Sequence, residues 1–287
     1  MSDSILQKDP VIAVKDLCVT FHQDKKSAEI VRDVSFEVRP GECLGILGES
    51  GSGKSMSIKA ALGLLEKNFE ITGEARFQGK DLLGMDRERL RRLRGREVTM
   101  VLQNPMNCFD PLYRVGEQMA ETFAEHTTWS GREIRTRSLE LLRLMKIRNP
   151  EEVLRQYPHQ MSGGMLQRVM IGLAVALKPS LIVCDEPTTA IDSISQWAIM
   201  QEFLRIKAAQ SAAMIFISHD LGVLSAIADR LVVMHRGRIV EAGTPEEIFE
   251  GASDPYTREL IARHRAVMAS FLAATQSQPA TEAHRAA

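Results

Sequence analysis

The chain has 287 residues, of which 44% are apolar and 25% charged, and its formal net charge is −1. This length is enough for one large domain or a core with a subdomain. The balanced charge excludes a global attraction to nucleic acid or to an anionic membrane. No apolar stretch approaches the roughly 20 residues of a membrane span, and the first residues lack a signal-peptide pattern. We therefore expect the protein to stay in the cytoplasm.

The N-terminal region alternates between apolar and polar residues, which predicts antiparallel strands or hairpins over 12–14, 17–21 and 34–38. A continuous apolar run over 43–47 predicts a buried strand, and a helix is expected to begin near Met56.

The loop between this buried strand and this helix matches the pattern G-x-x-x-x-G-K-[ST]. Its glycines let backbone N–H groups face a polyphosphate, and the helix N-terminus adds a partial positive charge. Lys54 is expected to reach the β- and γ-phosphates, and the Ser55 hydroxyl to ligate Mg²⁺. The predicted phosphate loop consists of Gly48, Glu49, Ser50, Gly51, Ser52, Gly53, Lys54 and Ser55.

The middle of the chain changes character after a short β-rich run over 98–103. An arginine-rich segment over 86–96 precedes it, and a solvated helix explains that segment better than a nucleic-acid patch because Glu88 and Glu97 dilute the charge. Helical periodicity then dominates over 115–125, 132–145, 151–156 and 165–177.

Apolar runs over 181–184 and 214–217 predict strands of a parallel sheet, with a helix over 195–209 between them and a hairpin over 231–241. We therefore expect an α/β fold: a P-loop (RecA-like) core with an antiparallel β subdomain and a helical insertion. The expected division is 1–103 for the β subdomain and the first part of the core, 104–179 for the helical subdomain, 180–250 for the second part of the core, and 251–287 for a C-terminal helix and disordered tail.

Asp185 and Glu186 follow the strand over 181–184, at the sheet edge where ligands of open α/β folds bind. Asp185 is suited to hold Mg²⁺, and Glu186 to polarise a water as general base. A solvated turn is the alternative, which the preceding apolar strand and the phosphate loop disfavour.

Ser162, Gly163 and Gly164 precede a helix without a break and form a second candidate anion-binding helix end. An ordinary helix cap is the alternative. Two such ends in one chain suggest that the second serves a neighbour's nucleotide.

From about Ile12 to about Ile261, the sequence resembles the nucleotide-binding subunit of ATP-binding-cassette transporters. The resemblance implies ATP and Mg²⁺ as cofactors and a head-to-tail dimer. The motifs appear along the chain in the same order as in that family. Gln103 corresponds to the Q-loop glutamine that senses Mg²⁺, and 162–165 to the signature motif. Asp185 and Glu186 correspond to the Mg²⁺-binding aspartate and the catalytic glutamate.

The same resemblance makes 190–192 the D-loop, His219 the histidine that contacts the γ-phosphate, and Phe21 the ring that stacks on adenine. Two positions depart from the family pattern. Met165 stands where glutamine is commonest, which puts side-chain contacts from that position in doubt. Ile191 replaces leucine and conserves volume.

The motifs Tyr157–Met165, Gln103–Pro105 with Phe109–Pro111, and Asp254–Arg258 resemble the peptide and nickel importers of the family. Peptide-importing members extend beyond the last motif with several cysteines, whereas about thirty residues without cysteine follow Arg258 here. We therefore expect import of nickel or a metal chelate, with di- or oligopeptides as the alternative.

The implied partners are a second ATPase subunit of the same or a paralogous chain, two membrane permeases and, indirectly, a periplasmic binding protein, with no nucleic acid. The implied location is peripheral, on the cytoplasmic face of the inner membrane. A soluble remodelling ATPase and an exporter subunit remain alternatives, although this chain has neither a second cassette nor a fused membrane span.

Overall fold

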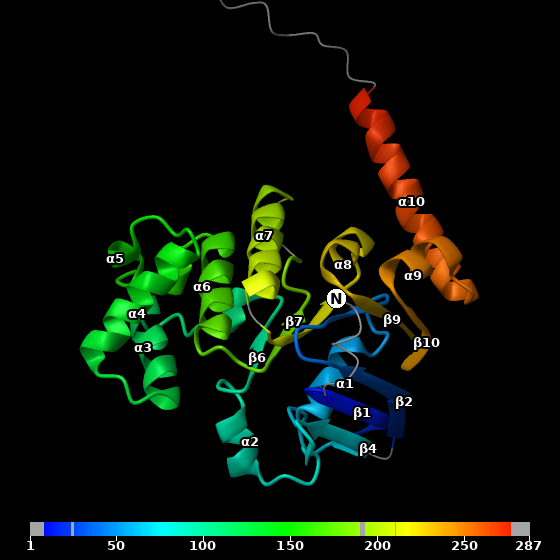
Figure 1. The fold of residues 1–287 in the computed structure, drawn as a ribbon, viewed down its shortest axis with the longest axis horizontal. Coiled ribbons are helices and arrows are strands. Elements are labelled where there is room, and N and C mark those ends of the chain that lie inside the picture. The colour runs from blue at the N-terminus through cyan, green and yellow to red at the C-terminus, as the bar shows by residue number, and fades with distance from the viewer. Residues whose placement is uncertain (1–8, 24–25, 190–192, 210, 277–287) are drawn as a thin grey trace, which may run out of the picture.

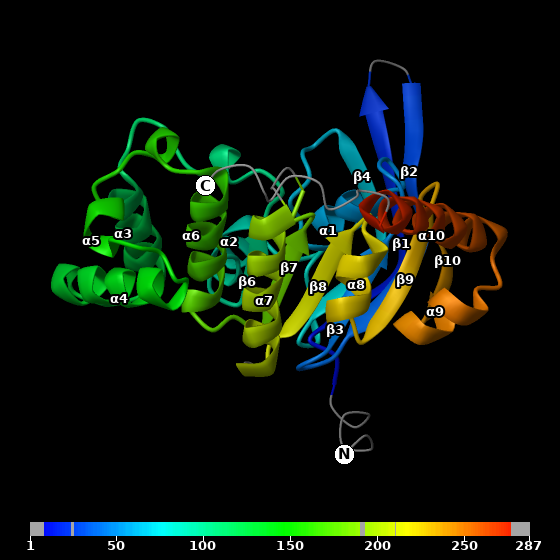
Figure 2. The ribbon, with the colours of Figure 1, turned by 90° about the horizontal axis from the view of Figure 1, so that it is seen from above.

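The computed structural model describes residues 9–23, 26–189, 193–209 and 211–276. Within these ranges the chain forms two sheets and a group of helices at one end of the molecule (Figures 1 and 2). The helices are α1 (Lys54–Ala61), α2 (Arg87–Leu93), α3 (Val115–His126), α4 (Gly131–Leu144), α5 (Pro150–Val153), α6 (Gly163–Ala176), α7 (Ser193–Ala209), α8 (Leu221–Ile227), α9 (Pro245–Gly251) and α10 (Pro255–Gln276).

The smaller sheet is antiparallel and has the strand order β2-β1-β4-β5. Its strands are β1 (Ile12–Gln23), β2 (Lys26–Val38), β4 (Phe69–Phe77) and β5 (Lys80–Asp81). The two strands predicted over 12–14 and 17–21 form one continuous strand, β1, which has an irregular conformation at Asp16. This residue has a φ of 50°, its N–H donates to Ser35 Oγ at 2.8 Å, and the pairing register shifts there. A local bulge at Asp16 therefore connects the two segments that the alternation of apolar and polar residues separates.

The larger sheet has the order β10-β9-β3-β8-β7-β6. Its strands are β3 (Cys43–Leu47), β6 (Val98–Val101), β7 (Leu181–Asp185), β8 (Ala213–Ser218), β9 (Arg230–His235) and β10 (Arg238–Gly243). All neighbours pair in parallel except β9 and β10, which form the predicted hairpin. The carboxyl ends of five strands therefore meet at one edge.

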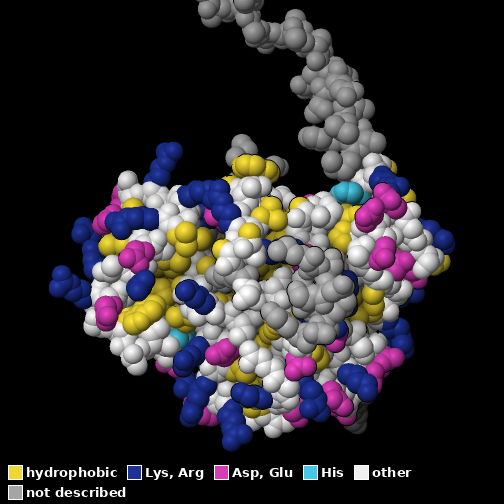
Figure 3. Space-filling model, viewed as in Figure 1, with side chains coloured by type: hydrophobic (Ala, Val, Ile, Leu, Met, Phe, Trp, Pro, Cys, Tyr) yellow, Lys and Arg dark blue, Asp and Glu magenta, His cyan; other side chains and the backbone are white. Residues whose placement is uncertain are grey.

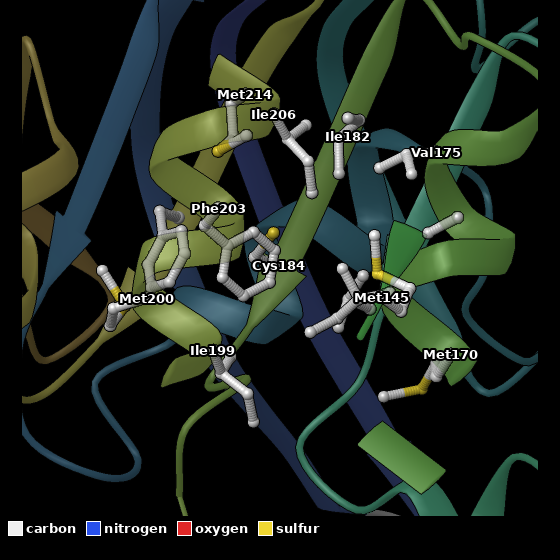
Figure 4. Packing of buried hydrophobic residues seen from close by; sticks show 14 of the residues in the cluster. Met145, Met170, Val175, Ile182, Cys184, Ile199, Met200, Phe203, Ile206 and Met214 are labelled. Atoms are coloured by element: carbon white, nitrogen blue, oxygen red, sulfur yellow. The ribbon is translucent and has the colours of Figure 1, made fainter. Parts of the chain in front are cut away.

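Alternate residues of the parallel strands enter two different cores, as the period of two in a strand requires. Met214 and Phe216 of β8 pack with α6, α7 and α8, and Ile215 and Ile217 with α1 and the smaller sheet. In the first core (Figure 4) the rings of Phe203 and Phe216 meet edge to face, with centroids 5.2 Å apart. Burial on both faces explains why these strands read as continuous apolar runs.

The helices α3, α4 and α5 lie together at the end of the molecule away from the smaller sheet (Figure 2). The predicted helix over 151–156 is shorter, because α5 ends at Val153. None of the helices in the described ranges combines the length and the apolar character needed to cross a lipid bilayer.

Gly45 in β3 lies against β9 and α8 with no room for a side chain. A β-carbon on Gly45 would lie 2.3 Å from Leu231 Cδ2 and 3.0 Å from Ala228 Cβ. We predict that Gly45→Ala lowers the free energy of unfolding by about 1–3 kcal/mol through overpacking. Chemical denaturation measures this change.

The matched control is Gly131→Ala, because a β-carbon there meets nothing within 4 Å. That exposed substitution should change stability by less than about 0.5 kcal/mol. Equal effects at the two positions would contradict the packing argument.

Candidate functional site

The predicted phosphate loop connects β3 to α1. Gly53 precedes α1 with a φ of 101° and has no side chain to cap the helix, so the first N–H groups of α1 are left for another acceptor. Gly48 and Ser52 lie on the inner side of the loop: a β-carbon on Gly48 would meet Met234 O at 2.3 Å, and Ser52 is buried. Gly51 faces open space. The loop is therefore packed closely against the protein at Gly48 and open to the surroundings at Gly51.

A cavity of about 620 Å³ opens beside this loop. It brings together side chains from the loop, from the segment after β6, and from the carboxyl ends of β7 and β8. The lining residues are Ile30, Glu49, Ser50, Gly51, Gly53, Lys54, Ser55, Met56, Lys59, Gln103, Asp185, Glu186 and His219. Most of the predicted site residues thus share one cavity.

Ser55 and Asp185 are in direct contact across this cavity. The Ser55 hydroxyl donates to Asp185 Oδ1 at 2.5 Å, although 130 residues separate them in the chain. A hydroxyl and a carboxylate are hard oxygen ligands of the kind that Mg²⁺ prefers. The donor set therefore fits the predicted cation.

Lys54 lies at the base of the loop and is buried. Its Nζ donates to the carbonyl oxygens of Gly48 at 2.8 Å and Glu49 at 2.9 Å. Burial lowers the pKa of Lys54, and the nearby carboxylates of Glu186 and Asp185 act in the opposite direction. The ammonium is thus held inside the loop, ready for an anionic ligand.

Glu186 has a φ of 48°, which is rare for a residue with a side chain. Its N–H donates to Ile217 O at 3.0 Å, and its Oε2 accepts from Thr189 Oγ1 at 3.1 Å. His219 Nδ1 lies 3.5 Å from the same Oε2. The strained backbone therefore points the carboxylate toward both His219 and the cavity.

Phe21, the residue predicted to stack on adenine, lies apart from this cavity. Phe21 is not among its lining residues within the described chain; its ring packs against Phe69 with centroids 4.9 Å apart. Ile30 of β2 lines the cavity instead, together with Met56 and Lys59. The sequence pattern of β2 did not identify Ile30 as a site residue, because Ile30 looks like any partly buried strand residue.

Ser162 caps α6, its Oγ accepting from the N–H of Met165 at 3.3 Å. Ser162 and Gly163 are exposed, and a β-carbon on Gly163 would meet nothing within 4 Å. Neither these residues nor Gly164 lines the cavity within the described chain. This helix end is therefore exposed at the surface. The predicted D-loop, 190–192, lies outside the described residues.

The loop, the lysine and the hydrogen-bonded Ser55 and Asp185 at the edge of a parallel sheet define a P-loop nucleotide-binding protein. Residues 31–189 match the ABC transporter family. The chain belongs to this family and is an ABC-type ATPase, as its resemblance indicated.

The chain is similar to ATP-binding proteins of import and transport systems. It is 42% identical over 261 residues to the ATP-binding protein of the metal-staphylopine import system of Staphylococcus aureus (strain NCTC 8325 / PS 47), covering 91% of this chain and 96% of that protein. It is 41% identical over 258 residues to a dipeptide transport ATP-binding protein of Lactococcus lactis subsp. cremoris, covering 89% and 74%.

Solved structures agree with the predicted fold. A dimeric ATP-binding cassette in a post-hydrolysis state, bound to ADP and Pi, aligns with a TM-score of 0.72 at 25% identity, covering 82% of this chain and 98% of that one. The predicted importer branch and α/β class are therefore confirmed.

Ser55→Ala tests the paired ligands. We predict roughly 10- to 100-fold weaker binding of MgATP, the loss expected when a hydrogen bond or ligand to a charged group is removed. Titration of a fluorescent ATP analogue at several Mg²⁺ concentrations measures this effect.

Ser57→Ala is the matched control, because Ser57 lies on the same helix and its hydroxyl donates to Gly53 O at 2.9 Å, outside the cavity lining. It should lower stability by about 1 kcal/mol and leave MgATP affinity near that of the parent. Weaker binding in both variants would point to general damage of α1.

Proposed function

We propose that the cavity binds MgATP, with the loop N–H groups and Lys54 holding the β- and γ-phosphates. Ser55 and Asp185 would ligate Mg²⁺, with Gln103 completing this side of the site. The observation that carries this proposal is the 2.5 Å contact between Ser55 and Asp185 at the mouth of the loop. Bound Mg²⁺ would neutralise charge that develops on the phosphates.

Glu186 is proposed as the general base. Its carboxylate lies in the cavity wall and is held by Thr189, so it is positioned to accept a proton from an attacking water. His219 is 58% exposed beside it and is proposed to contact the γ-phosphate. Lys54 and the helix end of α1 would stabilise the charge on the phosphate oxygens.

The open helix end at Ser162 is proposed to complete the site of a second subunit, of the same or a paralogous chain. Ser162 and Gly163 are exposed, and the N–H groups at such a helix end suit a phosphate, but within the described chain neither residue lines the cavity. Two copies arranged head to tail would each supply one such end to the other's nucleotide. ATP would then favour the closed pair by its higher affinity for that state.

A second, mostly apolar cavity of about 270 Å³ is proposed to receive a cytoplasmic segment of a permease. Leu62, Met100, Met170 and Leu173 line it, and Leu64 at its rim is 41% exposed. This second cavity lies where the end of α1 meets β6 and α6, and β6 is followed in the chain by Gln103. Movement of the docked segment would thereby be coupled to the nucleotide site.

A nucleic-acid partner is not proposed. In the arginine-rich helix α2, Arg91 pairs with Glu88 and Glu125, and Arg92 pairs with Glu88. Figure 3 shows basic and acidic side chains interspersed over the drawn face. These ion pairs reduce the positive charge that helix α2 offers to a phosphate backbone.

We infer that the chain powers an importer from the cytoplasmic face of the inner membrane, with two permeases and, indirectly, a periplasmic binding protein. The cargo that we propose is nickel or a metal chelate. The similarity to the metal-staphylopine subunit supports this class of cargo. The dipeptide transport relative, nearly as similar, makes di- or oligopeptides the second candidate.

Two substitutions separate binding from catalysis. Glu186→Gln should retain ATP binding and lower turnover by roughly 10²–10⁴-fold, as expected for the loss of a general base. Lys54→Ala should instead weaken nucleotide binding. Nucleotide titration and steady-state phosphate release measure the two effects, and near-normal turnover in the Glu186 variant would remove it from this role.

The cargo is tested in cells whose chromosomal gene carries Glu186→Gln, which leaves the subunit present for assembly. Nickel accumulation and the activity of a nickel enzyme should both fall, and excess nickel should restore them. Unchanged nickel uptake together with lost growth on a dipeptide would assign the peptide cargo instead.

A further inference from the structure

The phosphate loop is in contact with the C-terminal helix. The N–H of Glu49, the second residue of the loop, donates to Tyr256 Oη at 3.1 Å across 207 residues of sequence. Tyr256 lies in the first turn of α10, which begins beside α9 and β10 (Figure 1). The Asp254–Arg258 motif therefore places a side chain against the backbone of the phosphate loop.

The position of the Tyr256 ring is set from several sides. It stacks on His235 at the end of β9, with centroids 3.8 Å apart and an angle of 29° between the rings. Asp254 Oδ1 accepts from the N–H of Tyr256 at 2.9 Å, and Ser253 is tied to Glu241 of β10 by two hydrogen bonds. The hydroxyl is thus presented to the loop by a preformed turn rather than by a mobile side chain.

The same helix also contacts the side chain of Glu49. Arg263, two turns after Tyr256, places Nη1 3.0 Å from Glu49 Oε1 and Nη2 2.6 Å from Glu259 Oε1. Glu49 lines the cavity, so its carboxylate would otherwise repel a polyphosphate. Arg263 draws that carboxylate toward α10 and partly neutralises it.

We propose that Tyr256 and Arg263 are positioning residues that hold the first part of the phosphate loop in its binding conformation. Tyr256 satisfies the Glu49 N–H and fixes the backbone at the entrance of the loop. Arg263 turns the Glu49 side chain away from the phosphates. Preorganisation of this kind raises affinity because binding no longer has to order the loop. The inference rests on the proposed MgATP site.

Tyr256→Phe removes the hydroxyl and keeps the ring on His235. We expect MgATP and MgADP to bind about two- to tenfold more weakly, the effect of one net hydrogen bond, with KM raised and kcat retained. Tyr157→Phe is the matched control, since within the described chain the Tyr157 ring contacts Arg114 and His159 and is not in the cavity lining. It should leave KM unchanged.

A double-mutant cycle tests the charge. Arg263→Gln should raise KM for ATP, and this increase should be smaller in a Glu49→Gln background, where no carboxylate needs to be drawn away. All variants are measured in the full chain at low and high salt, because the exposed pair is screened by salt. Equal effects of Arg263→Gln in the two backgrounds would overturn its proposed role.

Unchanged nucleotide affinity in Tyr256→Phe would overturn the role of Tyr256, as would a loss of thermal stability and kcat with KM unaffected. Lys54→Ala, titrated alongside, distinguishes failure of the proposed nucleotide site from failure of the positioning role. If Lys54→Ala binds MgATP normally, the proposed nucleotide site is wrong. If it loses binding while Tyr256→Phe does not, only the positioning role fails.

Discussion

The parallel pairing of β3, β8 and β7 is the constraint on which the rest of the site depends. Leu47 is paired with Ser218, and Asp185 with Ile217. The loops that follow these strands therefore leave the sheet side by side, although they come from distant parts of the sequence. A slip of one residue would move every side chain to the opposite face and exchange the two cores. Burial of both faces makes that slip costly, so the packing of apolar residues fixes the distance between the loop and the carboxylates.

Much of this arrangement could be predicted because its signals are local. Continuous apolar runs identify the buried strands, and Gly48 to Ser55 carry the pattern of a phosphate loop within eight residues. What could not be predicted depends on pairing between distant segments. The bulge at Asp16 exists because β1 has partners on both sides, and Ile30 reaches the cavity through the position of β2 against the core. The motif around Tyr256 was informative as a family mark, but its contact with Glu49 has no local signal.

The backbone of Glu186 is strained at the point where its carboxylate enters the cavity wall. Glu186 adopts a left-handed conformation that most side chains avoid, and its N–H bond to Ile217 and the bond from Thr189 hold it there. Strain of this kind typically costs about 1–3 kcal/mol and persists only when the surroundings over-determine it. The left-handed backbone of Glu186 departs from the extended conformation of β7, and its carboxylate lies beside His219.

The hydrogen bond between Glu49 and Tyr256 has a consequence for biosynthesis. The antiparallel β1–β2 hairpin uses neighbouring segments, so it can form while the ribosome is still making the rest of the chain. The central strand β3 has to wait for β8 and β9, which are made much later, and the loop that follows it gains its last contact only when α10 emerges. The pocket beside the phosphate loop is therefore complete only after α10 has been made. Until β8 and β9 have been made, β3 lacks both of its partner strands, and unpaired apolar strands of this kind are prone to aggregation.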